Sequence, residues 1–108
     1  MSNNINNLYP KPAYASSAPV ADQRLAVDST AGGLQFTAYD TVSVSLVMFD
    51  IQTADVMATI DSSAPTTTNG HRLYAGMAYT WSTAMFNAAK FISATGTTAA
   101  IQASPLQI

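Results

Sequence analysis

From residue 24 onward, hydrophobic and polar residues alternate along most of the chain, and this period of two residues indicates half-buried β-strands. The runs RLAVDST (24–30) and LQFTAY (34–39) both alternate, and an Ala-Gly-Gly turn lies between them. Two alternating runs around a Gly pair are typical of a β-hairpin. We therefore predict that these two segments pair with each other.

The next predicted strand, VSVSLVMFD (42–50), follows a turn at Asp40 and Thr41. Its regular alternation runs through Val42, Val44, Leu46 and Met48. Val47 and Phe49 add hydrophobic side chains on the opposite face, so the end of this strand is apolar on both sides. Such a strand is buried on both faces. We expect a second sheet on one face, and the N-terminal arm, a helix or another subunit on the other.

Five further strand candidates follow along the chain: DVMATID (55–61), HRLYAG (71–76), MAYTWS (77–82), KFISAT (90–95) and TAAIQAS (98–104). The last two form a predicted hairpin around Gly96 and Thr97. Ser82 is a suitable N-cap for one or two helical turns, because Met85, Phe86 and Ala89 lie at helical spacing after it.

About seven short strands with Gly-marked turns and at most one short helix predict an all-β fold, either a small β-sandwich or a jelly-roll-like barrel. We assign this domain to residues 24–108. The pattern leaves the order of the strands open.

Residues 1–23, MSNNINNLYPKPAYASSAPVADQ, have a different composition, with three X-Pro steps and four Asn. Proline disfavours a helix and biases the residue before it toward extended conformations. Spaced apolar residues interrupt this polar segment, namely Ile5, Leu8, Tyr9, Tyr14 and Val20. We predict an extended arm that lies across another surface, with a frayed terminus as the alternative.

The chain is unusually poor in charge, with 9% Asp, Glu, Lys and Arg against roughly 25% in an ordinary soluble domain. Glu is absent, and Ala, Thr and Ser fill the sequence instead. A free monomer normally keeps a charged surface for solubility, so this composition favours a component of a larger assembly. A secreted or halotolerant β-domain is the alternative.

Several partners and compartments are disfavoured by the same composition. The net charge of −2 and the lack of a basic stripe argue against nucleic acid. No apolar run approaches the roughly 20 residues that cross a bilayer, and MSNNINNLYP lacks the features of a signal peptide. Without Cys, neither disulfides nor thiolate metal sites can form.

Catalytic and metal chemistry have little support in the sequence. Asp61, Ser62 or Ser63, and His71 are the residue types of a catalytic triad, but no nucleophile-elbow motif accompanies them. We expect no enzyme activity and no cofactor. The carboxylates of Asp50, Asp55 and Asp61 lack the spacing of a calcium loop, and a single Asp at a strand end usually caps a turn, so we expect no metal.

Three aromatic residues suggest a binding surface. Tyr79 and Trp81 share one face of a predicted strand, and Tyr74 lies just before it. An exposed platform of this kind holds sugars in many β-sandwiches, whereas the same spacing also fills the core of a small domain. We favour the core or a subunit interface, because large apolar patches rarely stay exposed.

The stretch DSSAPTTTNGHRLYAG (61–76) holds the one His and a turn at Asn69-Gly70 that needs a positive φ. It is longer than a tight hairpin, so we expect it to project from one end of the domain. In so charge-poor a chain, Arg72 should have an acceptor for its guanidinium. Asp61 is the simplest partner within the chain, and an acceptor on a neighbouring subunit is the alternative.

Residues from Thr59 to Ser104 follow the pattern T-x-D-x-S-A-P-T-x-x-N-G-H-x-L-x-A-G, then an apolar strand, A-K-F-I and a closing strand. In this pattern the chain resembles small tailed-bacteriophage structural proteins. The resemblance covers about half of the chain and none of residues 1–50. It implies a virion component with a β-sandwich or jelly-roll-like domain, most often in the head or neck, and made in the host cytoplasm. It brings no catalytic residues with it.

The low charge, the arm, the doubly apolar strand at Val47 and Phe49, and the resemblance together make a capsid decoration (cement) protein the leading hypothesis. Such a protein would bind the major capsid protein on the outer head surface and bridge adjacent subunits. We expect a homo-oligomer, with a trimer suggested by local three-fold positions on a shell. The interface candidates are Leu8, Tyr9, Tyr14, Val47, Phe49, Asn69, His71, Arg72 and Tyr74. A neck, head-tail connector or fibre-base protein, and a carbohydrate-binding adhesion module, are the alternatives.

Overall fold

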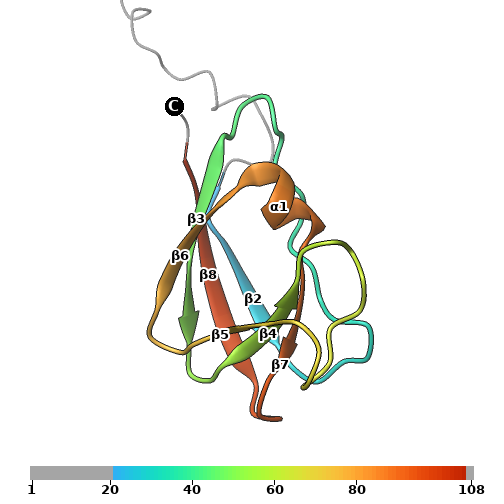
Figure 1. Ribbon diagram of the computed structural model, residues 1–108. Helices are drawn as coiled ribbons and strands as arrows, with labels where there is room; N and C mark the ends of the chain where they lie inside the picture. Colours follow the sequence, from blue (N-terminus) through green and yellow to red (C-terminus); the bar gives the residue numbers. More distant parts are fainter. Residues whose placement is uncertain (1–20, 107–108) are drawn as a thin grey trace, which may run out of the picture.

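The computed structural model describes residues 21–106, which form two antiparallel β-sheets and one short helix (Figure 1). The candidates Leu8, Tyr9 and Tyr14, with residues 1–20 of the predicted arm, lie outside the described residues, and Gln23 at the end of that arm is the first residue of β2. The elements are β2 (Gln23–Val27), β3 (Leu46–Gln52), β4 (Val56–Thr59), β5 (His71–Leu73), β6 (Ala78–Ser82), α1 (Thr83–Ala88), β7 (Lys90–Ser93) and β8 (Ala99–Leu106). The prediction of a small all-β fold with one short helix is therefore confirmed.

The strand order is β2-β8-β3-β6 in the four-stranded sheet and β5-β4-β7 in the three-stranded sheet. Strands that follow each other in the sequence mostly belong to different sheets, since the chain crosses from one sheet to the other between β3 and β4, between β5 and β6, between β6 and β7 through α1, and between β7 and β8. These crossings keep the two sheets together around one shared core.

The predicted hairpin between residues 24–30 and 34–39 is wrong. β2 pairs instead with β8, where Leu25 lies opposite Ile101. Residues 34–39 contain only one isolated bridge, from Leu34 to Phe91 of β7. The Gly turn does form, with the Gly33 amide donating to the Thr30 carbonyl at 3.1 Å, but it leads the chain toward β7, where Leu34 and Phe91 exchange two backbone bonds. β8 lies between β2 and β3 and buries hydrophobic side chains between these two neighbouring strands.

The predicted closing hairpin is also wrong, although its turn exists. The Ser93 hydroxyl donates to the Thr97 carbonyl and accepts from the Gly96 amide, at 2.6 and 3.0 Å. This side-chain cap takes the chain from β7 in one sheet to β8 in the other. The turn therefore joins the sheets rather than two paired strands.

The alternation in residues 42–50 changes phase at the start of β3. Val44 is buried beside the turn at Asp40, but from Leu46 onward the buried positions are Val47, Phe49 and Ile51. The predicted inward residue Met48 is 44% exposed. The bend at Ser45, between Val44 and Leu46, shifts the phase of the alternation, so the strand is fully buried on one face only.

Val47 and Phe49 consequently belong to the protein's own core, at 0% and 1% exposure. This corrects their assignment as interface candidates, because a side chain with no exposed surface cannot contact a partner. The strand that is buried on both faces is β4, in which all four residues are buried.

The core lies between the two sheets and is centred on Phe49. Its ring centroid lies 4.8 Å from Trp81, 5.4 Å from Phe86 and 5.7 Å from Tyr79. Phe86 comes from α1, which begins as predicted at Ser82, whose hydroxyl accepts the Met85 amide at 3.2 Å. The helix thus covers one end of the core with an aromatic side chain.

Candidate functional site

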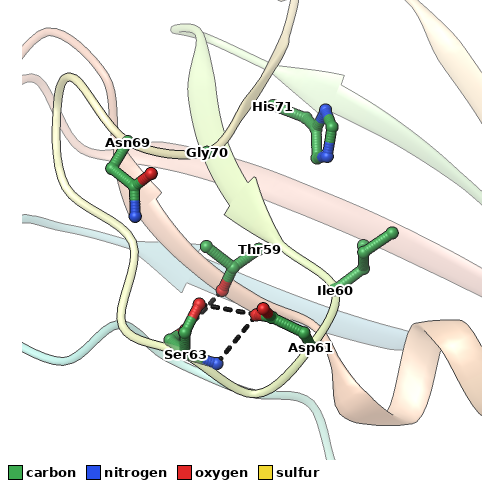
Figure 2. Close-up of a pocket in the computed structure, with 7 residues that line it drawn as sticks. All are labelled: Thr59, Ile60, Asp61, Ser63, Asn69, Gly70 and His71. Carbon is green, nitrogen blue, oxygen red and sulfur yellow. Dashed lines mark hydrogen bonds between the residues drawn. The ribbon is translucent and has the colours of Figure 1, made fainter.

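A shallow pocket of about 350 Å³ lies beside the connection between β4 and β5 (Figure 2). Its lining comprises Thr59, Ile60, Asp61, Ser63, Asn69, Gly70 and His71. The pocket therefore lies mostly within the stretch 61–76 that the sequence singled out, with Thr59 and Ile60 added from the end of β4 and the residue after it, and it brings together two of the interface candidates, Asn69 and His71. The long connection folds back on the end of β4 rather than projecting freely.

One side of the pocket is a hydrogen-bonded turn. The Asp61 carboxylate accepts both the amide and the hydroxyl of Ser63, at 3.1 and 2.5 Å, and the Thr59 hydroxyl donates to the Ser63 carbonyl (Figure 2). These bonds to Ser63, led by the hydroxyl, lower the pKa of Asp61 below its ordinary value. Asp61 therefore acts as a turn cap.

Gly70 forms the opposite side, where the chain enters β5 close to β4. Its φ is +139°, and a Cβ built on it would lie 2.9 Å from the Ala58 carbonyl oxygen. Only glycine fits this close approach in this conformation. The Asn69-Gly70 turn predicted from the sequence is thereby confirmed in its positive φ.

The groups of a catalytic triad do not assemble in this pocket. Asp61 bonds to Ser63, but within residues 21–106 no hydrogen bond joins the His71 ring to Asp61, Ser62 or Ser63. Figure 2 shows the His71 ring apart from the bonded groups. Among the described residues, no group of three or more His, Asp or Glu side chains is placed to hold a metal ion.

Arg72 has an acceptor within the chain, but it is Asp55 rather than the predicted Asp61. Its Nε and Nη2 atoms lie 3.0 and 2.8 Å from Asp55 Oδ2. The Ala75 amide donates to Asp55 Oδ1 at 2.8 Å, and this bond, followed by that from Arg72, lowers the pKa of Asp55. Asp55 directly precedes β4, and Arg72 lies beside Met57 in the next strand, so the ion pair spans two neighbouring strands.

The aromatic residues divide between core and surface. Tyr79 and Trp81 are partly buried and pack on Phe49, which confirms the core interpretation and leaves no exposed Tyr-Trp platform. Tyr74 is 54% exposed beside Arg72, whose guanidinium lies 5.8 Å from the centre of its ring. The Tyr79 hydroxyl accepts the Tyr74 amide at 3.0 Å and holds this turn in place.

The outer face of the four-stranded sheet is a second candidate site that sequence reasoning missed. The register places thirteen alternating side chains on it: Arg24, Ala26, Leu46, Met48, Asp50, Gln52, Ala78, Thr80, Ser82, Ala100, Gln102, Ser104 and Leu106. We call this set the outer sheet face. Small or uncharged side chains dominate it, and Met48 and Leu106 are among the exposed large hydrophobic residues.

The two charges on the outer sheet face are linked through one amide. Arg24 donates to Gln52 at 2.8 Å and to Gln102 at 3.3 Å, and Gln52 donates to Asp50 at 2.8 Å. Each charge therefore already has a polar partner on the same face. The signal for this face was present in the alternation of β3, but the wrong phase concealed it.

Comparison of the chain with protein-family models, curated proteins and solved structures gives no match. No helix within residues 21–106 is long and apolar enough to span a membrane.

Proposed function

We propose that this protein is a non-enzymatic structural subunit of a virion, and that it decorates the head by binding the major capsid protein through the outer sheet face. The observation that carries the proposal is the chemistry of this face. A broad sheet surface presents Ala, Ser, Thr, Met and Leu, and its two charges, Arg24 and Asp50, are both engaged within it.

Such a face suits burial against another protein. Charged groups that lose water on binding cost free energy unless they are paired, and here the pairing exists before any partner binds. Met48 and Leu106 supply apolar area at the end of the sheet where β3 begins and β8 ends. Methionine is also enriched at protein interfaces.

The resemblance to tailed-bacteriophage structural proteins supports a virion rather than another assembly. Its motif, from Thr59 to Gly76, forms the Asp61 turn, the close approach at Gly70 and the strand that carries Arg72. These contacts hold the chain to itself, so the motif supports the fold and the outer sheet face supplies the interaction.

The proposed mechanism is stabilisation of the shell by added interface. Contacts that exist only in the assembled shell favour that state by mass action, as any ligand favours the state that it binds. A shell carrying the protein should therefore resist heat and internal pressure better than a shell without it.

Copy number in purified virions tests this proposal. Quantitative mass spectrometry should find the protein in amounts comparable to the major capsid protein, and shells without it should disassemble at lower temperature. A few copies per particle would favour a neck, head-tail connector or fibre-base protein. Absence from virions would overturn the proposal and favour the carbohydrate-binding alternative, now limited to the polar pocket beside His71 and to Tyr74.

A further inference from the structure

Within residues 21–106, β6 is an outer strand of the four-stranded sheet, and no strand lies beside it on the side away from β3 (Figure 1). The bonds at its two ends fix which residues face β3: the Ile51 amide donates to the Met77 carbonyl at 3.0 Å, and the Thr83 amide donates to the Ser45 carbonyl at 3.2 Å. Both pairs involve odd-numbered residues. In an antiparallel ladder the bonded pairs alternate, so Tyr79 and Trp81 also bond to β3.

The even-numbered residues of β6 consequently direct their backbone groups away from the sheet. These are Ala78 and Thr80, together with the amide of Ser82. No backbone bond to any of them occurs from elsewhere in residues 21–106. An unpaired row of amides and carbonyls is a template for another strand.

Other sheet edges in the described part of the chain are partly covered. At β7, Leu34 exchanges two backbone bonds with Phe91, at 2.8 and 2.9 Å, and the Ser93 amide donates to Asp28. At β2, the Gln23 side chain bonds both the amide and the carbonyl of Thr37. β5 is only three residues long. β6 combines a free side with five residues of strand.

We propose that β6 pairs with β6 of a second copy of this chain, antiparallel, about a two-fold axis at Thr80. With the axis there, all five residues of each strand find a partner: Thr80 faces Thr80, Ala78 faces Ser82, and Tyr79 faces Trp81. Even-numbered residues then meet even-numbered residues, which are the ones with free backbone groups.

The side chains of β6 fit this arrangement. Proteins protect an exposed sheet edge with charged side chains, proline or an irregular backbone. β6 has none of these features, because it contains no charged residue, no proline and no residue with a positive φ. On the outer sheet face the pairing brings together small or β-branched uncharged residues. On the core side it brings the partly buried Tyr79 and Trp81 together across the axis, and aromatic cross-strand pairs stabilise a sheet.

The pairing joins two four-stranded sheets into one continuous sheet and sets two outer sheet faces side by side. It goes beyond the proposed function and does not depend on it, because it occurs between copies in solution without a shell. A two-fold pair also differs from the trimer suggested by capsid lattices.

Analytical ultracentrifugation of the full chain over a range of concentrations tests the pairing, with Thr80→Lys as the main variant. Thr80 is exposed, so the lysine is compatible with the fold, yet it places two like charges opposite each other at the axis. We expect a monomer-dimer equilibrium in the unchanged protein and a dissociation constant raised by about tenfold in the variant. Thermal melting checks that the variant is folded.

Two controls make the result specific. Ser104→Lys adds the same charge to the same face on the central strand β8, and it should leave the dimer intact. An equimolar mixture of the Thr80→Lys and Thr80→Glu proteins places opposite charges across the axis, and it should restore the dimer. A protein that stays monomeric or forms a trimer, equal effects of the two lysines, or no recovery in the mixture would each overturn the proposal.

Discussion

The two sheets of this protein differ in what covers their outer faces. On the three-stranded sheet, Met57 and Ile92 point outward yet are buried, and Pro65 of the long connection packs beside Gly33 and Lys90 on the same side. On the four-stranded sheet, Met48 is exposed among small uncharged neighbours.

This difference shows how a chain with few charges distributes them. Around the three-stranded sheet, the carboxylates of Asp55 and Asp61 fasten the chain's own loops. On the four-stranded sheet, Arg24 and Asp50 are linked through the Gln52 side chain within the outer sheet face, and these hydrogen bonds do not hold a loop against it. Only the second arrangement leaves a broad neutral surface for another protein.

The largest expected effect is a difference in stability between substitutions on the two faces of β3. Phe49→Ala should lower the free energy of unfolding by about 3–5 kcal/mol, because it removes the ring at the centre of the shared core. Met48→Ala, one residue away on the outer sheet face, should cost less than about 1 kcal/mol. Urea unfolding of both variants measures this contrast, and similar losses would contradict the assigned phase of β3.

A smaller effect is expected where the long connection meets the three-stranded sheet. Gly70→Ala should destabilise the protein by about 1–3 kcal/mol, since φ is +139° and the new Cβ would meet the Ala58 carbonyl oxygen. Gly96→Ala is the control, because its φ is also positive but nothing lies within 4 Å of its Cβ position. Thermal unfolding should rank the Gly70 variant lower, and the reverse order would refute the close approach.

The hydrogen bonds of Asp55 at the three-stranded sheet should make the free energy of unfolding depend on pH in the acid range. The pKa of Asp55 is lower in the folded protein than its ordinary 3.8, so the folded state binds fewer protons across that interval. The resulting stability is present above about pH 4 and is lost as the pH falls through the folded pKa. Asp55→Asn should flatten this acid limb in unfolding measurements from neutral to acid pH. Asp22→Asn removes the same charge at an exposed position, and identical curves for the two variants would contradict the role of Asp55.

The smallest effect on stability is expected on the outer sheet face, which is the proposed binding surface for the capsid. Met48→Lys should change the free energy of unfolding by no more than about 0.5 kcal/mol, because the side chain is already in contact with water. Binding to capsid shells, measured by co-sedimentation, should nevertheless be lost. Lys90→Met changes the charge in the opposite sense on the other sheet and should leave binding unchanged; undiminished binding by the Met48 variant would argue against this face.

Local signals in the sequence were reliable where the cause was local. Ser82 caps α1 through its own hydroxyl, and Gly70 takes the positive φ that its turn needs. The pocket has a local cause as well, because its lining residues come from two short segments of the chain, 59–63 and 69–71.

Partners distant in the sequence were not predictable in this way. The low charge of the chain predicted that Arg72 has an acceptor for its guanidinium. The acceptor is Asp55 rather than Asp61, because β4 and β5 are neighbouring strands. The outer sheet face likewise depended on the phase of β3, which the bend at Ser45 directly before the strand reverses.

The sequence by itself determined the class of fold, the helix cap, the glycine turns and the low charge on which the hypothesis of an assembly rests. These follow from the preferences of single residues and from short periodic patterns. Tertiary structure alone decided that β8 lies between β2 and β3, that Val47 and Phe49 are core, and that β6 is an edge strand among the residues the structure describes. Strand order depends on which strand faces can be buried against each other. The free energy of this burial comes from contacts between segments that are far apart in the chain.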